Sequence, residues 1–382
     1  MQTRSQNRKK LQAYSLDEPQ IAIFDIGTRA IRLLVGPKQK ISNWDHQIFF
    51  NASRLTNLGE DINQEMRIGT NSKGLQSIIS FMNDFIPILK NHDVEIYAFG
   101  TAIFRWMKNA PDTIAYIKRM TEIEICILSQ TQEAYMSCLS LYATRDINKT
   151  KHGKQGEDIN TSANLRKHLL LIDQGGGSTE ISLLSINALD ELHDTKLMSF
   201  DDLGSIALRD SFLLTAQDGT SVLEQYVDLQ KLIRQRIDDW IHFEELETAQ
   251  QNSHEDDRKQ PSQIICYGMG SAISNLFTEH NYKAHNQVVG LEELSTFINT
   301  SKERFFANNP NVDVFREKLS QMDRGLQKRF LYTCALEVHH RILEKFGFSK
   351  IRMCGYGLRY GIFVHLVYLD KKIISEQPST SK

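Results

Sequence analysis

The sequence predicts an α/β protein that is built from two related domains. Apolar segments of strand length alternate with longer segments of helical spacing along the 382 residues, and this alternation is typical of α/β folds. Two segments, IFDIGTRAIRLLV at 23–35 and LIDQGGGSTEISLL at 171–184, share one plan. In each, an apolar strand leads to an aspartate, a glycine two residues on, a small polar turn and a second apolar strand. The repeat predicts one hairpin per domain, with Asp25 and Asp173 facing a common cleft.

The first domain is predicted to span residues 20–130, after a basic tail at 1–19. The tail begins MQTRSQNRKK, which lacks the apolar stretch of a secretory signal and is typical of disordered chain. In chain order, the patterns predict strands at IAIFDIG and AIRLLVG, a helix over 70–90, a strand at EIYAFG, a helix over 103–120 and a strand at IEICILS.

The second domain is predicted to span residues 131–365, before a C-terminal tail at 366–382. Two stretches within it, near 146–167 and 247–262, are rich in polar and charged residues and almost lack large apolar ones. Such stretches are typical of solvated insertions between packed elements.

Composition and charge limit the classes of partner. The net charge of −2 gives no overall attraction for nucleic acid, so we expect no nucleic-acid partner. The longest apolar runs, such as GIFVHLVYL at 361–369, are too short to cross a bilayer, so we expect no membrane association. Five cysteines without a CxxC pair indicate free thiols in a reducing compartment, which predicts a cytoplasmic protein.

The glycines of the second motif predict a phosphate-binding loop. Three consecutive glycines let backbone N–H groups converge on an anion, and the Ser-Thr pair that follows adds hydroxyl donors. The carboxylates on either side, Asp173 and Glu180, repel phosphate and so imply a divalent cation, for which Mg²⁺ is the usual choice. The alternative is an ordinary glycine-rich hairpin or bulge, although a hairpin needs only one or two glycines.

Several motifs together resemble the exopolyphosphatase / guanosine pentaphosphate phosphatase (Ppx/GppA) family, over about residues 21–363. LIDQGGGSTEISLL resembles the second phosphate motif of that family, and FDIGTRAIRLLV resembles the first. GTAIFRWMKN is similar to its loop-helix signature, which includes Arg105, and ILSQTQEAYM to the segment of its catalytic glutamate, which falls on Glu133. LGSIALRDSF, YGMGSAISNL and GYGLRYGIF match three further signatures.

The resemblance implies two ribonuclease-H-like domains of the actin-like ATPase superfamily, with a phosphate-filled cleft between them. It also implies Mg²⁺-dependent release of a terminal phosphate from polyphosphate or guanosine pentaphosphate, by a member of the short class. The expected catalytic residues are Glu133 and Asp173, and the expected metal ligands are Asp173 and Glu180. The expected phosphate-binding residues are Asp25, Gly27, Thr28, Arg29, Arg105, Gly175, Gly176, Gly177, Ser178, Gly268, Gly270 and Ser271. A homodimer is left open.

Local physics gives Glu133 a reason to be ionised. Ser129 and Gln132 match a capping box, so Glu133 falls in the first turn of a helix, where the positive end of the dipole favours a carboxylate. An ionised carboxylate facing a terminal phosphate can orient and deprotonate water. The alternative is an ordinary acidic residue at a helix start. Arg105 likewise has two interpretations, a bidentate phosphate contact or a surface salt bridge, and Gly268 and Gly270 could simply form a helix-entry turn.

The sequence departs from the family pattern at the first loop and around Glu133. The usual Ser-Asn-Ser after the loop glycine is Thr28-Arg29-Ala30, which loses a hydroxyl and gains a cation. Arg29 would either bind phosphate by charge or block the pocket. Other residues that replace common family residues are Gln130, Gln132, Tyr135 and Gly355. Since Glu133, Asp173 and Glu180 are kept, we expect an active enzyme with altered substrate preference.

Two other functions remain open. The altered first loop suggests a catalytically weak sensor that binds nucleotide or polyphosphate on the same fold. An ATP-dependent kinase of the wider superfamily would need an acceptor pocket and an adenine site, and no motif in the sequence indicates either.

Overall fold

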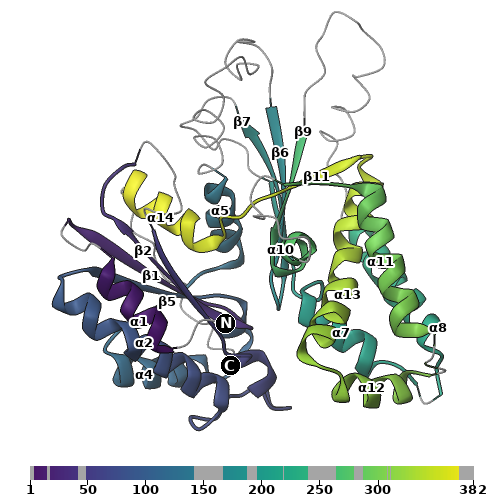
Figure 1. Cartoon of the computed structure of the whole chain (residues 1–382), viewed down its shortest axis with the longest axis horizontal. Helices are drawn as coiled ribbons and strands as arrows, with labels where there is room; N and C mark the ends of the chain where they lie inside the picture. The colour runs from purple at the N-terminus through teal and green to yellow at the C-terminus, as the bar shows by residue number, and fades with distance from the viewer. Residues whose placement is uncertain are drawn as a thin grey trace, which may run out of the picture. The chain divides into compact units, whose positions relative to one another are not determined.

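The computed structural model describes residues 4–14, 18–41, 49–141, 167–186, 196–217, 219–239, 264–278, 287–307, 309 and 311–369. The chain divides into two compact units: Met1–Gly156 with Tyr356–Lys382 form the first unit, and Glu157–Gly355 form the second (Figure 1). Each unit contains one sheet with helices packed on it, which confirms the predicted α/β class with two ribonuclease-H-like parts. That Asp25 and Asp173 face one cleft stays a prediction.

The sheet of the first unit has five strands in the order β3-β2-β1-β4-β5. β1 pairs antiparallel with β2, β2 antiparallel with β3, and β4 and β5 continue the sheet parallel to β1. The first motif therefore forms the β1–β2 hairpin, as predicted. The strands are β1 (Gln20–Ile26), β2 (Ala30–Pro37), β3 (Phe50–Leu55), β4 (Glu95–Gly100) and β5 (Ile125–Ile127).

Helices cover both faces of this sheet (Figure 1). On one face, the ring of Phe24 lies 6.3 Å from that of Phe81 in α2. On the other, a β-carbon added to Gly36 would lie 3.2 Å from the ring of Phe363 in α14. The helical elements are α1 (Arg4–Ala13), the 3₁₀ helix η2 (Leu58–Asp61), α2 (Lys73–Asn91), α3 (Ala102–Trp106), α4 (Ala110–Thr121), α5 (Gln130–Ser140) and α14 (Leu358–Tyr368).

The alternation of side chains along β1 and β2 places two charged residues on the α14 face. Gly36 is opposite Ile21 in the hairpin, and Asp25 is opposite Arg32. Because residues that are two apart share a face, Asp25 and Arg32 point to the same side as Gly36, toward α14.

The units differ from the predicted domains at both boundaries. The prediction assigned residues from 131 onward to the second domain, but α5 and α14 pack against each other and belong to the first unit. The chain thus returns to the first unit after completing the second. The predicted insertion at 247–262, all but the last residue of the one near 146–167, and residues 370–382 of the predicted tail lie outside the described residues.

Two local predictions in the first unit were wrong. The predicted disordered tail contains α1, because Leu11 is fully buried and the ring of Tyr14 lies 6.3 Å from that of Phe50. The predicted helix over 103–120 is two helices, α3 and α4. The break occurs where the side-chain amide of Asn109 exchanges hydrogen bonds of 3.1 and 2.9 Å with the backbone of Ile68.

The sheet of the second unit repeats the plan of the first. Its order is β10-β11-β9-β6-β7-β8, and the run β8-β7-β6-β9-β11 has the same order and the same strand directions as β3-β2-β1-β4-β5. The second motif forms the β6–β7 hairpin, which confirms the predicted internal repeat. The strands are β6 (Lys167–Gln174), β7 (Thr179–Ile186), β8 (Lys196–Phe200), β9 (Ile264–Gly270), β10 (Val288–Gly290) and β11 (Lys350–Met353).

The core of the second unit lies between one face of its sheet and the helices around α13. Leu170, Ile172 and Ile181 contribute from the sheet, and the rings of Phe212, Phe315 and Phe330 pack edge to face within it. The helices are α7 (Ser205–Leu214), α8 (Val222–Asp239), α10 (Ser271–Thr278), α11 (Leu291–Phe306), α12 (Val312–Gln321) and α13 (Arg324–Lys345). Among the described residues of both units, no helix combines the length and the apolar character needed to cross a membrane.

Candidate functional site

The first loop, Gly27–Ala30, is held in place through its backbone carbonyls. Gly27 N donates to Ala30 O at 3.0 Å and closes the hairpin, while the carbonyl of Thr28 accepts from Gly59 N at 2.9 Å. The carbonyl of Arg29 accepts from two backbone N–H groups at 3.0 Å each, those of Thr56 and Asn57. A β-carbon at Gly59 would lie 2.5 Å from the methyl group of Thr28, so the loop and the start of η2 pack directly together. These contacts hold the backbone of the loop in one conformation.

Two arginines gather on the α14 face beside this loop. Arg32 Nη1 lies 3.4 Å from Asp25 Oδ2. Arg359, from α14, donates to Asn51 Oδ1 at 3.2 Å, and its guanidinium lies over the ring of Tyr360. Burial lowers the pKa of Arg359 below its ordinary value, and the charge of Arg32 lowers it further. Since arginine keeps its charge in proteins, this face carries two cations against the one carboxylate of Asp25, and its excess positive charge favours an anionic ligand.

Sequence reasoning did not assign a role to Arg32. A signal was available, since the tight turn at Gly27–Ala30 fixes the register of the hairpin and so places Arg32 opposite Asp25.

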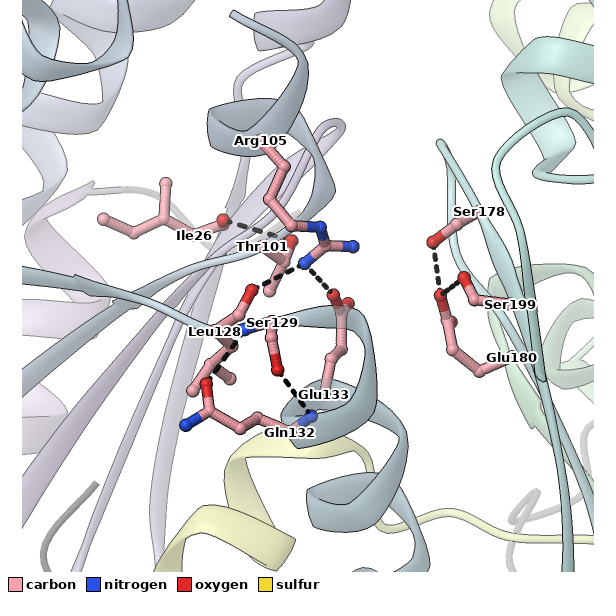
Figure 2. Close-up of polar contacts among 10 residues, drawn as sticks. All are labelled: Ile26, Thr101, Arg105, Leu128, Ser129, Gln132, Glu133, Ser178, Glu180 and Ser199. Atoms are coloured by element: carbon pink, nitrogen blue, oxygen red, sulfur yellow. Dashed lines mark hydrogen bonds and ion pairs between the residues drawn. The ribbon is translucent and has the colours of Figure 1, made fainter. Parts of the chain in front are cut away.

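Glu133 lies where the sequence predicted, in the first turn of α5 (Figure 2). The capping box is present: Ser129 Oγ accepts from Gln132 N at 3.1 Å, and Gln132 Oε1 accepts from Ser129 N at 2.9 Å. Both bonds hold the start of the helix, and the positive end of its dipole favours the ionised form of Glu133.

Glu133 forms an ion pair with Arg105, which lies in the last turn of the short helix α3 (Figure 2). Arg105 Nη1 lies 2.8 Å from Glu133 Oε2 and donates to Leu128 O at the same distance. The two side chains are only 14% and 12% exposed. A pair so shielded from water is not the surface salt bridge of the alternative interpretation, and a phosphate contact by Arg105 stays a prediction.

Arg105 still has donors for an anion. Its Nε and Nη2 atoms are buried and make no hydrogen bond to the described residues. Leaving buried donors unpaired costs free energy, so this arginine is suited to bind an acceptor beside Glu133.

The second loop, Gly175–Ser178, repeats the geometry of the first. Gly175 N donates to Ser178 O at 2.9 Å, and the carbonyls of Gly175 and Gly176 accept from the backbone of Ser205 and Ile206 at 3.0 and 2.8 Å. These donors lie at the start of α7, where a β-carbon on Gly204 would lie 2.2 Å from the backbone of Gly177. Gly204 therefore holds α7 against the loop, as Gly59 holds η2 against the first loop. Each glycine follows a leucine, an echo between LGED and LGSI that the sequence reasoning missed.

Asp173 and Glu180 lie opposite each other in the β6–β7 hairpin, on one face of the sheet. Glu180 is 2% exposed, and its Oε1 accepts from Ser178 Oγ at 2.6 Å and from Ser199 Oγ at 3.0 Å (Figure 2). The hydroxyls of Ser178 and Thr179 are thus bonded within the protein, and their role as phosphate donors stays a prediction. Both are buried, and that of Thr179 donates to Leu203 O at 2.8 Å.

The paired carboxylates of Asp173 and Glu180 are the kind of oxygen ligand that Mg²⁺ takes in proteins, and a divalent cation there stays a prediction. Arg32 lies opposite Asp25 in the first hairpin, whereas Glu180, a second carboxylate, lies opposite Asp173 in the second. Among the described residues, no group of three or more histidine, cysteine or acidic side chains could hold a metal alone. Mg²⁺ does not require one, since it is usually bound by one or two carboxylates together with substrate phosphates and water.

The remaining predicted residues lie at the β9–α10 junction. Gly270 has a φ of 104°, and a β-carbon there would lie 2.1 Å from Gln174 O, so only glycine fits. A β-carbon on Gly268 would lie 2.8 Å from the side chain of Ile351, which gives this glycine a packing role within the sheet. Ser271 begins α10, so Gly270 stands at the entry to this helix, and a phosphate contact by these residues stays a prediction.

Known proteins share both a sequence segment and the fold of this chain. The Ppx/GppA phosphatase family model matches residues 39–152. A Ppx/GppA family member of Aquifex aeolicus is 18% identical, with a TM-score of 0.60 over 93% of this chain and 99% of its own. A structure from Cytophaga hutchinsonii, described as an exopolyphosphatase, is 18% identical, with a TM-score of 0.62 over 93% of this chain and 100% of its own. No curated protein sequence matches. The family segment around Arg105 and Glu133, within a fold shared along nearly the whole chain, confirms the predicted resemblance to the Ppx/GppA phosphatase family.

Proposed function

We propose that this protein hydrolyses the terminal phosphoanhydride bond of polyphosphate or guanosine pentaphosphate, with Glu133 as the general base. The observation that carries the proposal is the shielded Arg105–Glu133 pair at the first turn of a capped helix. The pair lies inside the segment that matches the Ppx/GppA phosphatase family model, which supports phosphatase chemistry at this position.

In the proposed reaction, a water oxygen attacks the terminal phosphorus and the bridging P–O bond breaks. Glu133 accepts a proton from the attacking water, and the rest of the chain leaves with the bridging oxygen and its electron pair. A positioned base of this kind accelerates the reaction roughly 10²–10⁴-fold. The ion pair keeps Glu133 ionised and correctly oriented, while the unpaired donors of Arg105 bind an oxygen of the phosphate.

The other proposed contacts are divided between the units. In the first unit, Arg32 and Arg359 neutralise charge on the phosphate chain. In the second, the N–H groups of the glycine loop bind phosphate oxygens, and Asp173 and Glu180 would hold Mg²⁺. When bound, the ion would supply positive charge that offsets repulsion between these carboxylates and the phosphate.

A second candidate function is a catalytically weak sensor of phosphate chains. Arg29 favours it, because this cation stands in the first loop where the family usually has a neutral residue. A sensor would bind the same anions without turning them over.

Phosphate release discriminates between the two functions. The protein is incubated with polyphosphate, guanosine pentaphosphate or ATP, with Mg²⁺ or with excess chelator, and free phosphate is measured over time. The proposal predicts Mg²⁺-dependent release from polyphosphate or guanosine pentaphosphate. Binding of either without release would support the sensor, and undiminished release in chelator would contradict the metal assignment.

A further inference from the structure

Helix α14 crosses α5 so closely that one of its residues has no room for a side chain. A β-carbon added to Gly361 would lie 1.6 Å from Met136 O, 2.5 Å from Met136 C and 3.1 Å from Ser140 N. All three atoms belong to the backbone of α5, so no rotation of a side chain relieves the clash. The contact lies within one turn of Glu133, because Met136 is three residues further along the same helix.

The backbone conformation of Gly361 does not explain the glycine. The residue lies inside α14, where other residues adopt the same angles. Glycine in a helix interior costs about 1 kcal/mol relative to alanine, so local stability favours a different residue. The close approach of the two helices is the remaining physical reason.

Helix α14 contacts the sheet near its start and α5 after the crossing. Near its start, Arg359 donates to Asn51 Oδ1 on β3, and Asn51 Nδ2 donates to Tyr360 Oη at 3.0 Å. One turn after the crossing, the ring of His365 lies 6.1 Å from that of Tyr135 on α5. Helix α14 is therefore fixed to the sheet at one end and packed against α5 along its length. It thereby holds α5 in place relative to the sheet.

We propose that Gly361 is a positioning residue for Glu133, which rests on the proposed function of Glu133 as the base. Atoms that are not bonded pack at about 3.5 Å, so an added methyl group must separate α5 from α14 by more than 1 Å. Because Arg359 and Tyr360 hold α14 to Asn51 on the sheet, we expect α5 to take up the shift. Displacing a reacting group by about 1 Å costs roughly 10²-fold in rate. Gly361→Ala therefore lowers kcat roughly 10²-fold and changes KM less, because Arg32 and the first loop lie on the sheet and not on the two helices.

The test measures phosphate release by Gly361→Ala alone and in a Glu133→Gln background. If Gly361 acts through Glu133, the substitution loses most of its effect once Glu133 is gone, and kcat of the double variant stays within about threefold of Glu133→Gln. Ile78→Val, in the buried face of α2, is the control for a general loss of stability: its melting temperature falls while kcat stays at the parent value.

If Gly361→Ala does not fold, His365→Ala provides a second test, because it removes a side chain and adds no clash. The substitution weakens the packing of α14 on α5 at the same crossing, so kcat should fall several-fold while KM is unchanged. If Gly361→Ala and His365→Ala both keep the parent kcat while Glu133→Gln loses turnover, the positioning role is overturned and the proposed function stands. Parent turnover in Glu133→Gln overturns the proposed function instead.

Discussion

His339, in the middle of α13, makes the stability of the protein sensitive to acid. Its side chain is fully buried, and burial lowers its pKa from 6.5 to about 4, an effect that the Ala335 carbonyl opposes only in part. The folded state therefore holds His339 neutral at a pH where the unfolded chain is already protonated. Because the folded pKa is the lower one, the free energy of unfolding falls as the pH drops from about 6.5 to 4.

The size of the loss follows from the two pKa values. Each unit of pKa difference corresponds to about 1.4 kcal/mol, so the full difference is worth roughly 3 kcal/mol. Between pH 7.5 and pH 5, most of that range is crossed, and the expected loss is about 2 kcal/mol. This is a large fraction of the stability of an ordinary domain.

Urea unfolding of the parent and of His339→Leu, followed by circular dichroism at the two pH values, tests this reasoning. Leucine fills similar space without titrating, so its stability relative to the parent should rise by about 2 kcal/mol at pH 5 compared with pH 7.5. Ile342→Val, on the same helix and also fully buried, should keep a constant difference from the parent at both pH values. An equal pH dependence in the parent and in His339→Leu would refute the assignment to His339.

Three further substitutions test other contacts. Arg105→Met should lower kcat/KM roughly 10²-fold in phosphate release, because it removes both the partner of Glu133 and a phosphate donor; an unchanged value would mean that the pair has no catalytic role. Ser199→Ala removes a hydrogen bond to Glu180 and should raise the Mg²⁺ concentration for half-maximal activity roughly 10-fold, so an unchanged requirement would place the metal elsewhere. Asp84→Ala leaves Arg54 without its partner at 2.8 Å and should lower the free energy of unfolding by about 3 kcal/mol in urea. A loss below about 1 kcal/mol would indicate that water replaces the carboxylate.

Local patterns in the sequence were sufficient for the hairpins and for the start of α5. The glycine turns, the apolar runs of β1 and β6 and the capping box at Ser129 each depend on residues close together in the chain. For the same reason, the sequence placed Glu133 in the first helical turn.

Contacts between distant parts of the chain were not predicted. α14 belongs to the first unit through Gly361 and Met136, which are far apart in sequence, and no local pattern indicates such a crossing. The pairing of Arg105 with Glu133 likewise depends on how α3 and α5 pack. The bond from Ser178 to Glu180 could have been inferred, since the serine stands two residues before Glu180, directly ahead of β7. The break before α4 was also signalled, by Asn109 and by the proline two residues later.

The rate of phosphate release by Glu133→Gln tests the central claim most directly. Glutamine keeps the shape and removes the charge, so binding of the phosphate chain should survive while kcat falls roughly 10²-fold or more without a matching rise in KM. Adding Gln132→Glu to this variant places a carboxylate one position earlier in the same capped turn. Turnover should not return, because the side chain at position 132 is bonded to Ser129 N in the capping box. Hydrolysis of polyphosphate and guanosine pentaphosphate by Glu133→Gln at the parent rate would contradict the account, and Glu133 would then be only an acidic residue at a helix start.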